Sequence, residues 1–109
     1  MEIGIGDARG STVVEITGDI DMYSSPELRE KLMGLVKGKP PVVILDFSKV
    51  SYIDSSGIAT FVEGLKGMKS YGGRLKFFGV SAGIREIFCF SKLDRVFEIY
   101  DSFDDAMKK

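Results

Sequence analysis

The residues of this sequence with the clearest chemical potential are an aspartate and two serines, Asp54, Ser55 and Ser56, which directly precede a helical pattern. A helix start offers free backbone N–H groups and a dipole that stabilise negative charge, so it would accommodate a phosphate on one of these serines. Aspartate and serine are also the commonest helix N-caps in the absence of any function. The duplicated cap favours a functional site, as does Gly57, which lowers helix propensity but lets another surface approach the backbone.

The composition excludes most kinds of catalytic centre. The 109 residues include no His and a single Cys, Cys89, which rules out Ser-His-Asp triads, Cys-His pairs and ordinary zinc sites. A phosphate-binding loop of the Gly-x-x-x-x-Gly-Lys type is also missing from the sequence. We therefore expect no enzymatic activity, no cofactor and no metal ion.

Charge and hydropathy narrow the possible partners and location. With 15 Lys and Arg against 16 Asp and Glu, the net charge is -1, so no basic excess is offered to nucleic acid. The longest apolar stretch, residues 40–45, is far shorter than the roughly 20 residues that cross a bilayer. The N-terminus has no signal-peptide pattern, and one Cys cannot form an internal disulfide. These features predict a cytoplasmic protein without nucleic acid or membrane partners, and a monomer is the default expectation.

The elements that must position the two serines follow from alternating strand-like and helical patterns. Residues 42–45 are apolar at consecutive positions, which is typical of a central strand covered on both faces. Apolar residues then recur at helical spacing from Ile58 to Met68. The whole chain predicts the order β-β-α-β-α-β-α-β-α. This is an α/β fold in one domain over residues 1–109, with a mixed, mostly parallel sheet of about five strands, about four helices and an opening antiparallel hairpin.

Several element bounds are expected from turn and cap residues. The first helix starts either at Ser24, in a capping box with Glu27, or at Ser25, with Pro26 in the first helical position. Residues 48–54 read as a connector between the central strand and the second helix. The other expected strands lie near residues 1–5, 11–17, 74–79 and 96–100, and the later helices at 82–90 and 102–108.

The second helix carries two glycines, Gly64 and Gly67, beside Thr60 and Glu63 on the face away from its apolar residues. Each glycine costs about 1 kcal/mol relative to alanine in an exposed helix interior. The result is a face of low relief. Two explanations remain open: tight contact with a neighbouring loop, or a docking face for a partner protein.

Four segments of the chain together resemble the STAS family, and more narrowly its stand-alone bacterial members, the anti-sigma factor antagonists. The resemblance covers nearly the whole chain, in order and with similar spacing. Its segments are Gly18-Asp19-Ile20-Asp21, Val43-Ile44-Leu45-Asp46, Ile53-Asp54-Ser55-Ser56-Gly57-Ile58 and the tail pattern from Ile84 to Tyr100. Ile58 stands where leucine is usual, which is a conservative departure.

The resemblance implies a phosphorylation switch at the first hydroxyl after the motif aspartate, which is Ser55 here. A partner that is both anti-sigma factor and serine kinase would bind the unmodified protein and release the sigma factor. The phosphorylated protein would dissociate until a serine phosphatase restores it. Asp21 matches the family's aspartate near the serine, and Asp54 would hold the motif at the helix start. The expected partner-binding or site-flanking residues are Asp21, Asp54, Ser56, Gly57 and Thr60.

Three alternatives compete with this interpretation. A receiver-like phosphoacceptor would use the strand-end residues Asp19, Asp21 and Asp46, but a receiver opens β-α rather than with a hairpin. An enzyme with a serine nucleophile at Ser55 would lack a base, since the sequence has no His and no lysine near that serine. The third alternative keeps the fold: a STAS-type phosphorylation-controlled or nucleotide-binding interaction module that acts on a non-sigma partner.

Overall fold

The first two strands form the hairpin that the sequence predicts. The computed structural model describes residues 1–108, in which β1 (Glu2–Ala8) pairs antiparallel with β2 (Ser11–Ile20). The hairpin turn, Arg9 and Gly10, has φ angles of 51° and 85°. A two-residue turn with both φ angles positive is the type that matches the twist of an antiparallel pair.

The remaining strands join the hairpin in parallel. Within residues 1–108 the sheet has five strands in the order β1-β2-β3-β4-β5, with β3 (Val42–Ile53) in the centre, followed by β4 (Arg74–Phe78) and β5 (Glu98–Tyr100). The helices are α1 (Ser25–Lys37), α2 (Ser55–Lys69), α3 (Ala82–Phe90) and α4 (Phe103–Lys108), with a 3-10 turn at Leu93–Arg95. The predicted fold class and element order are confirmed.

The central strand is longer than expected. Val43, Ile44 and Leu45 are fully buried, which confirms the strand covered on both faces. The prediction of a connector at residues 48–54 is wrong, because β3 continues to Ile53 and pairs with the second half of β2 through register shifts. The second half of β3 contains several exposed polar residues, and this composition is typical of a loop.

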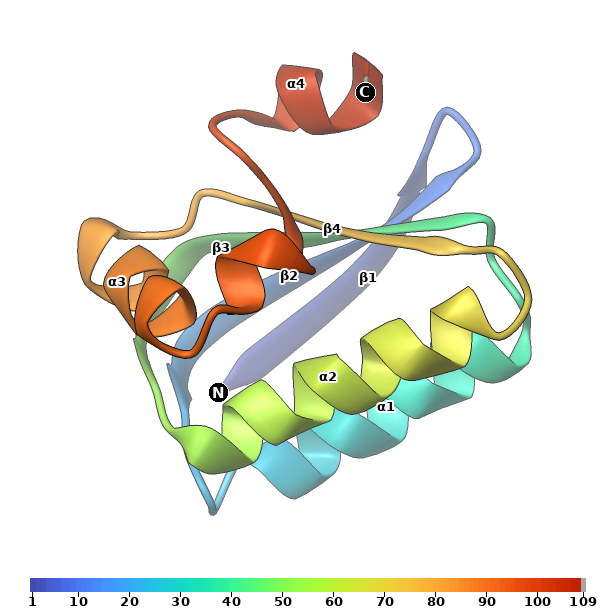
Figure 1. Cartoon of the computed structure of the whole chain (residues 1–109). Coiled ribbons are helices and arrows are strands. Elements are labelled where there is room, and N and C mark those ends of the chain that lie inside the picture. The colour runs from blue at the N-terminus through green and yellow to red at the C-terminus, as the bar shows by residue number, and fades with distance from the viewer. Residues whose placement is uncertain (109) are drawn as a thin grey trace.

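The helices lie on both faces of the sheet (Figure 1). Helices α1 and α2 run side by side across one face, and α4 lies on the other. The low-relief face of α2 packs against α1: a Cβ added at Gly64 would lie 2.7 Å from Leu32 Cδ2, and one at Gly67 would lie 2.9 Å from Val36 Cγ1. The glycines therefore serve close contact with the neighbouring helix, rather than with a loop or a partner.

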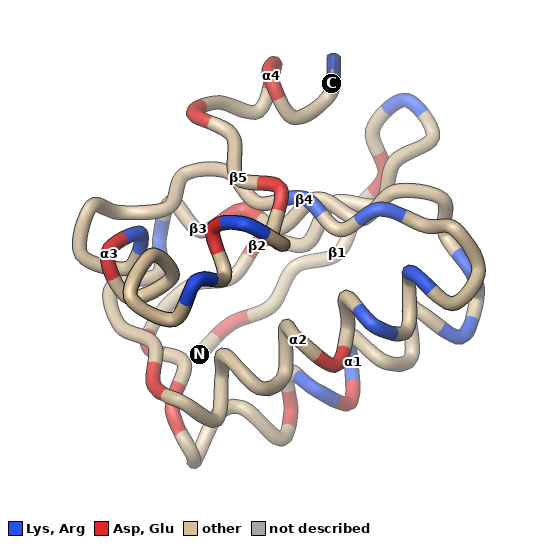
Figure 2. Tube along the Cα trace, viewed as in Figure 1, with Lys and Arg blue, Asp and Glu red and all other residues tan. Residues whose placement is uncertain are grey.

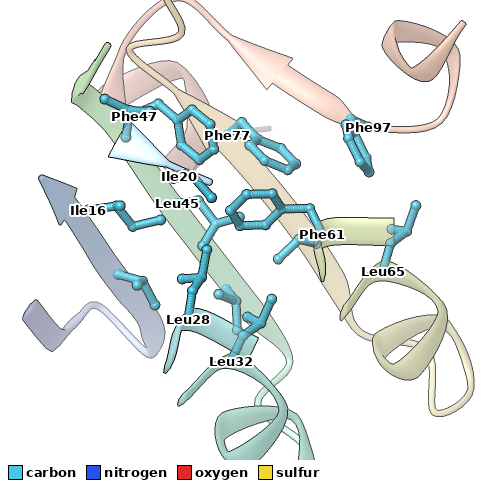
Figure 3. Close-up of a cluster of buried hydrophobic side chains, with 14 of the residues drawn as sticks. Ile16, Ile20, Leu28, Leu32, Leu45, Phe47, Phe61, Leu65, Phe77 and Phe97 are labelled. Atoms are coloured by element: carbon cyan, nitrogen blue, oxygen red, sulfur yellow. The ribbon is translucent and has the colours of Figure 1, made fainter. Parts of the chain in front are cut away.

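The core beneath α1 and α2 combines aliphatic and aromatic side chains (Figure 3). The ring centroid of Phe47 lies 5.3 Å from those of both Phe61 and Phe77. All three rings are fully buried, so β3, α2 and β4 are held by one aromatic cluster. Tilted and edge-on aromatic pairs of this kind stabilise a core beyond the area that they bury. The cluster fixes α2 against the sheet, and with it the position of its first turn.

Candidate functional site

Asp54 is the N-cap of α2. Its carboxylate accepts hydrogen bonds from Ser56 N (2.9 Å), Gly57 N (3.3 Å) and Ser56 Oγ (2.5 Å). The bond from the Ser56 hydroxyl is the main reason that the pKa of Asp54 lies below its usual value, with burial opposing it and backbone N–H groups adding to it. The carboxylate therefore already occupies two N–H groups that the sequence analysis expected to be free for a phosphate.

Ser55 differs from every neighbouring serine. It is exposed at the start of α2, and its hydroxyl makes no hydrogen bond to any of residues 1–108. Ser56 is half-buried, and its hydroxyl both donates to Asp54 and accepts from the Ser25 hydroxyl at 3.1 Å. Of the two candidate phosphoacceptors, Ser55 is the one whose hydroxyl an enzyme can reach without breaking a network.

The bond between Ser25 and Ser56 joins the starts of α1 and α2, and the sequence analysis missed it. Ser25 is buried inside the first turn of α1, so the prediction that it caps the helix is wrong. Ser24 occupies the cap position, but its hydroxyl accepts from Asp21 N (3.0 Å) and donates to Asp19 O (2.9 Å) instead of capping. The serine pair before Pro26 indicated a helix start, but it could not indicate the bond to Ser56. That bond depends on the packing of α1 against α2.

Asp21 shapes the turn from β2 into α1. Its carboxylate accepts hydrogen bonds from Tyr23 N (2.9 Å) and Ser24 N (3.0 Å). This turn lies beside the start of α2, because Asp54 N donates to Ile20 O at 3.0 Å. Asp21 and Asp54 thus belong to two segments that are joined by the backbone at the carboxyl end of the parallel strands.

Gly57 and Thr60 support the site from inside. A Cβ at Gly57 would lie 2.5 Å from Ile20 Cγ2 and 2.8 Å from Ile53 Cγ1. The surface that approaches the backbone at this glycine is therefore the chain's own core. Thr60 is 4% exposed, and its hydroxyl donates to Ser56 O at 3.0 Å. Both residues are buried beneath the serines, on the core side of α2, and expose almost no surface.

Three large side chains around the site are exposed although the sequence analysis did not single them out. Met22, Tyr23 and Tyr52 are 64%, 87% and 51% exposed. Met22 and Tyr23 lie between β2 and α1, outside any strand or helix period, and that position is the signal that could have found them. Exposed apolar side chains that gather at one end of a soluble protein often mark an interaction surface.

Charge is distributed unevenly between the two ends of the helix pair. Acidic residues lie toward the end where α1 and α2 begin, and basic residues toward the end where they finish (Figure 2). The acidic end includes Asp21 and Asp54, while Lys37, Lys66 and Lys69 occupy the last turns of the helices. A negative group added at Ser55 would thus meet like charges.

The described residues contain neither a metal cluster nor a membrane-spanning helix. Among residues 1–108 no group of three or more His, Cys, Asp or Glu side chains could hold a metal ion. Within the same residues no helix combines the length and the apolar character needed to span a bilayer.

A comparison with protein families identifies the family to which the chain belongs. The sequence model of the STAS domain matches residues 4–106. The chain belongs to the STAS domain family. This confirms the resemblance seen in the sequence, and the receiver-like and serine-enzyme alternatives are not supported.

Relatives of this STAS protein include named regulators. It is 38% identical over 86 residues to the anti-sigma-B factor antagonist of Bacillus subtilis, covering 79% of this chain and 78% of that protein. It resembles the solved structure of an anti-sigma factor antagonist from Mycobacterium paratuberculosis, with a TM-score of 0.89, 25% identity and coverage of 97% and 90% of the two chains. The fold also matches that of the Bacillus cell fate determinant SpoIIAA in its phosphorylated form, with a TM-score of 0.75, 21% identity and coverage of 97% and 96%.

Proposed function

We propose that this STAS protein is an anti-sigma factor antagonist that is switched off by phosphorylation of Ser55. The unmodified protein binds an anti-sigma factor with serine kinase activity, so that the sigma factor is released. A serine phosphatase restores the phosphorylated protein. The protein is a cytoplasmic ligand and substrate without catalytic activity of its own. In this switch it acts as a single copy on its partner.

The observation that carries the proposal is the contrast between Ser55 and the serines around it. Ser55 is exposed and its hydroxyl is unengaged within residues 1–108, whereas the hydroxyls of Ser24, Ser25 and Ser56 are all hydrogen-bonded. Membership of the STAS family and the similarity to anti-sigma factor antagonists support the choice of partner. The site is surrounded by exposed large side chains that suit a protein partner, namely Met22, Tyr23 and Tyr52.

The switch is electrostatic and local. A phosphate adds about -1.5 to -2 charges at pH 7, next to a carboxylate at Asp54 that already holds the N–H groups of Ser56 and Gly57. The phosphate is therefore directed outward instead of being held by its own helix. Burying it without a cation in a protein interface costs on the order of 4 kcal/mol, which is about a thousandfold in affinity. The fold need not change for the partner to be released.

A reconstituted displacement assay tests this function. Each anti-sigma kinase encoded in the source genome is purified in complex with its sigma factor. The unmodified or the phosphorylated protein is then added under conditions in which the kinase hydrolyses no nucleotide, so that the phosphorylation state of the added protein does not change. The unmodified protein should release a sigma factor from one of these complexes, and the phosphorylated protein should not. If neither form binds any such kinase, the antagonist role is refuted, and a STAS module with a non-sigma partner becomes the better interpretation.

A further inference from the structure

The exposed apolar side chains of α3 form a stripe along one flank of the helix. Ile84 and Phe88, four residues apart, are buried and hold α3 on the core. Ile87 and Phe90, three residues apart, are 37% and 93% exposed. Residues at this spacing lie on the same side of a helix, so Ile87 and Phe90 form one apolar stripe outside the core.

An ion pair shows which way this stripe faces. Arg85 Nη2 lies 3.5 Å from Asp101 Oδ1, and Asp101 directly follows β5, the edge strand of the sheet. The flank of α3 that carries Arg85 therefore faces the β5 edge. Ile87 and Phe90 lie on the opposite flank, because residues two and five positions apart point to different sides of a helix. The stripe thus faces away from β5, toward β3 and α2.

Ser55 lies on the flank of α2 that faces α3. The other flank contacts α1 through Ser56 and Gly64, whereas Ser55 shares its flank with the half-buried Ile58 and Val62. The helices α1, α2 and α3 follow the neighbouring parallel strands β2, β3 and β4, so they begin at one edge of the sheet in that order. The start of α2 and the end of α3 lie at this same end of the molecule (Figure 1).

We propose that the stripe of Ile87 and Phe90 is a second contact surface for the anti-sigma kinase, with Phe90 as its anchor, a role that rests on the proposed function of Ser55. A stable protein interface buries about 800 Å² on each partner. This area is far larger than one serine offers. A kinase that binds at Ser55 must therefore also cover the side chains around it.

The surroundings of Ser55 differ in chemistry on its two sides. On the α1 side the helix surface carries an exposed ion pair, in which Arg29 Nη2 lies 2.6 Å from Glu63 Oε2. Charged groups are depleted at the centre of protein interfaces, where aromatic side chains are enriched. On the α3 side the Phe90 ring is almost entirely in water, and an apolar surface of the kinase would remove that area from water. The α3 side therefore suits the apolar centre of the interface.

Phe90 would bind the kinase without acting in phosphoryl transfer. Its ring is on α3, whereas the hydroxyl that receives the phosphate is on α2. A contact that is equally strong before and during the reaction lowers KM and leaves kcat unchanged. Loss of the Phe90 ring should therefore raise the KM for phosphorylation of Ser55 without changing kcat.

Binding and kinetics with the cognate kinase test this surface on the full chain. Phe90→Ser should weaken binding by about tenfold to a hundredfold, as is typical of an aromatic anchor, and should raise KM by a similar factor. Phe90→Leu keeps an apolar side chain and should lose less. Ile5→Thr is the matched control, because it removes exposed apolar surface from β1; its affinity should stay within about twofold of the wild type.

The controls separate this surface from the proposed function. Since the Phe90 side chain is 93% exposed, Phe90→Ser should unfold at the same urea concentration as the wild type. Unchanged affinity of Phe90→Ser, with a wild type that binds the kinase and is phosphorylated at Ser55, would overturn this surface and leave the proposed function standing. Equal weakening by Ile5→Thr, or a dimer of this chain that depends on Phe90 while kinase binding does not, would also overturn it. A wild type that binds no such kinase would refute both.

Discussion

Two helices of this protein begin side by side with a pair of serines, and the pairs are used in opposite ways. At the start of α1, Ser24 is folded back onto Asp19 and Asp21, and Ser25 is buried against α2. At the start of α2, Asp54 caps the helix through Ser56 and Gly57, and Ser55 is left exposed. The same pair of residue types therefore joins the two helices at the start of α1 and leaves an exposed hydroxyl without a hydrogen bond at the start of α2.

The difference lies in which residue satisfies the first backbone N–H groups. In α2 the aspartate supplies the cap, so neither serine hydroxyl is needed to bond the backbone there. In α1 no side chain caps the helix, and Pro26 in the first turn reduces the number of N–H groups that need a partner. A helix start with a carboxylate cap can therefore expose a serine, whereas α1 commits both of its serines to the fold.

The largest effect should come from charge at the exposed serine. Ser55→Glu should weaken binding to the anti-sigma kinase by up to about a thousandfold, because the added carboxylate is desolvated beside Asp54. Ser70→Glu places the same charge just beyond the other end of α2, and it should change the affinity little. Titration calorimetry with the kinase measures both. Equal weakening by the two variants would show that net charge, and not the position of Ser55, controls binding.

The next largest effect is expected on stability, when a buried glycine of α2 and an exposed glycine of α1 are each replaced by alanine. Gly57→Ala should lower the free energy of unfolding by about 1–3 kcal/mol, because the new methyl group overlaps Ile20 and Ile53. Gly34→Ala adds the same methyl group where nothing lies within 4 Å, and it should raise stability by about 0.5–1 kcal/mol. Urea unfolding distinguishes the two. A stable Gly57→Ala variant would mean that the α2 start is loosely packed.

The hydrogen bond between Ser25 and Ser56, which joins the starts of α1 and α2, should contribute less to stability. Ser25→Ala removes the hydrogen bond to the Ser56 hydroxyl, and we expect it to destabilise the fold by about 1 kcal/mol while leaving Ser55 phosphorylation intact. The exposed Ser51 donates to Asp19 at 2.8 Å. Ser51→Ala serves as the control, and its loss should be smaller because water replaces the bond. If Ser25→Ala instead blocked phosphorylation, the two helix starts would share one functional role.

The smallest effect is a pH dependence from the cap of α2. The pKa of Asp54 in the folded protein lies below its usual value of 3.8, chiefly because the Ser56 hydroxyl donates to the carboxylate. The carboxylate therefore contributes stability that is fully present above the unfolded pKa and is lost as the pH falls through the folded pKa. Between neutral pH and pH 3, the stability of Asp54→Asn should fall less than that of the wild type. Parallel pH profiles would contradict this role of the cap.

Local sequence signals were sufficient for most of the fold. Consecutive apolar residues identified the central strand at Val43, Ile44 and Leu45, and helical spacing from Ile58 identified α2. The second half of β3 was not predicted as a strand. Its pairing with β2 shifts register, so its buried residues lose the strict alternation that is typical of a strand. A pattern read along one strand cannot show a bulge that depends on its neighbour.

The site was predictable in outline but not in its contacts. The motif around Ser55 is continuous in sequence, and the cap at Asp54 follows from its position before a helix. The bond from Ser25 to Ser56 and the contact of Gly64 with Leu32 both depend on how closely α1 packs against α2. Such contacts join residues about thirty positions apart, so they arise from tertiary packing and leave no local pattern.

The most direct test of the account is the intact mass of four proteins after incubation with MgATP and the cognate kinase: the wild type, Ser55→Ala, Ser56→Ala and Ser24→Ala. The wild type, Ser56→Ala and Ser24→Ala should each gain one phosphate. Ser55→Ala should gain none, although it should still capture the kinase. A phosphate gained by Ser55→Ala and lost in Ser56→Ala would contradict the assignment of Ser55 as the exposed and reactive serine of the pair.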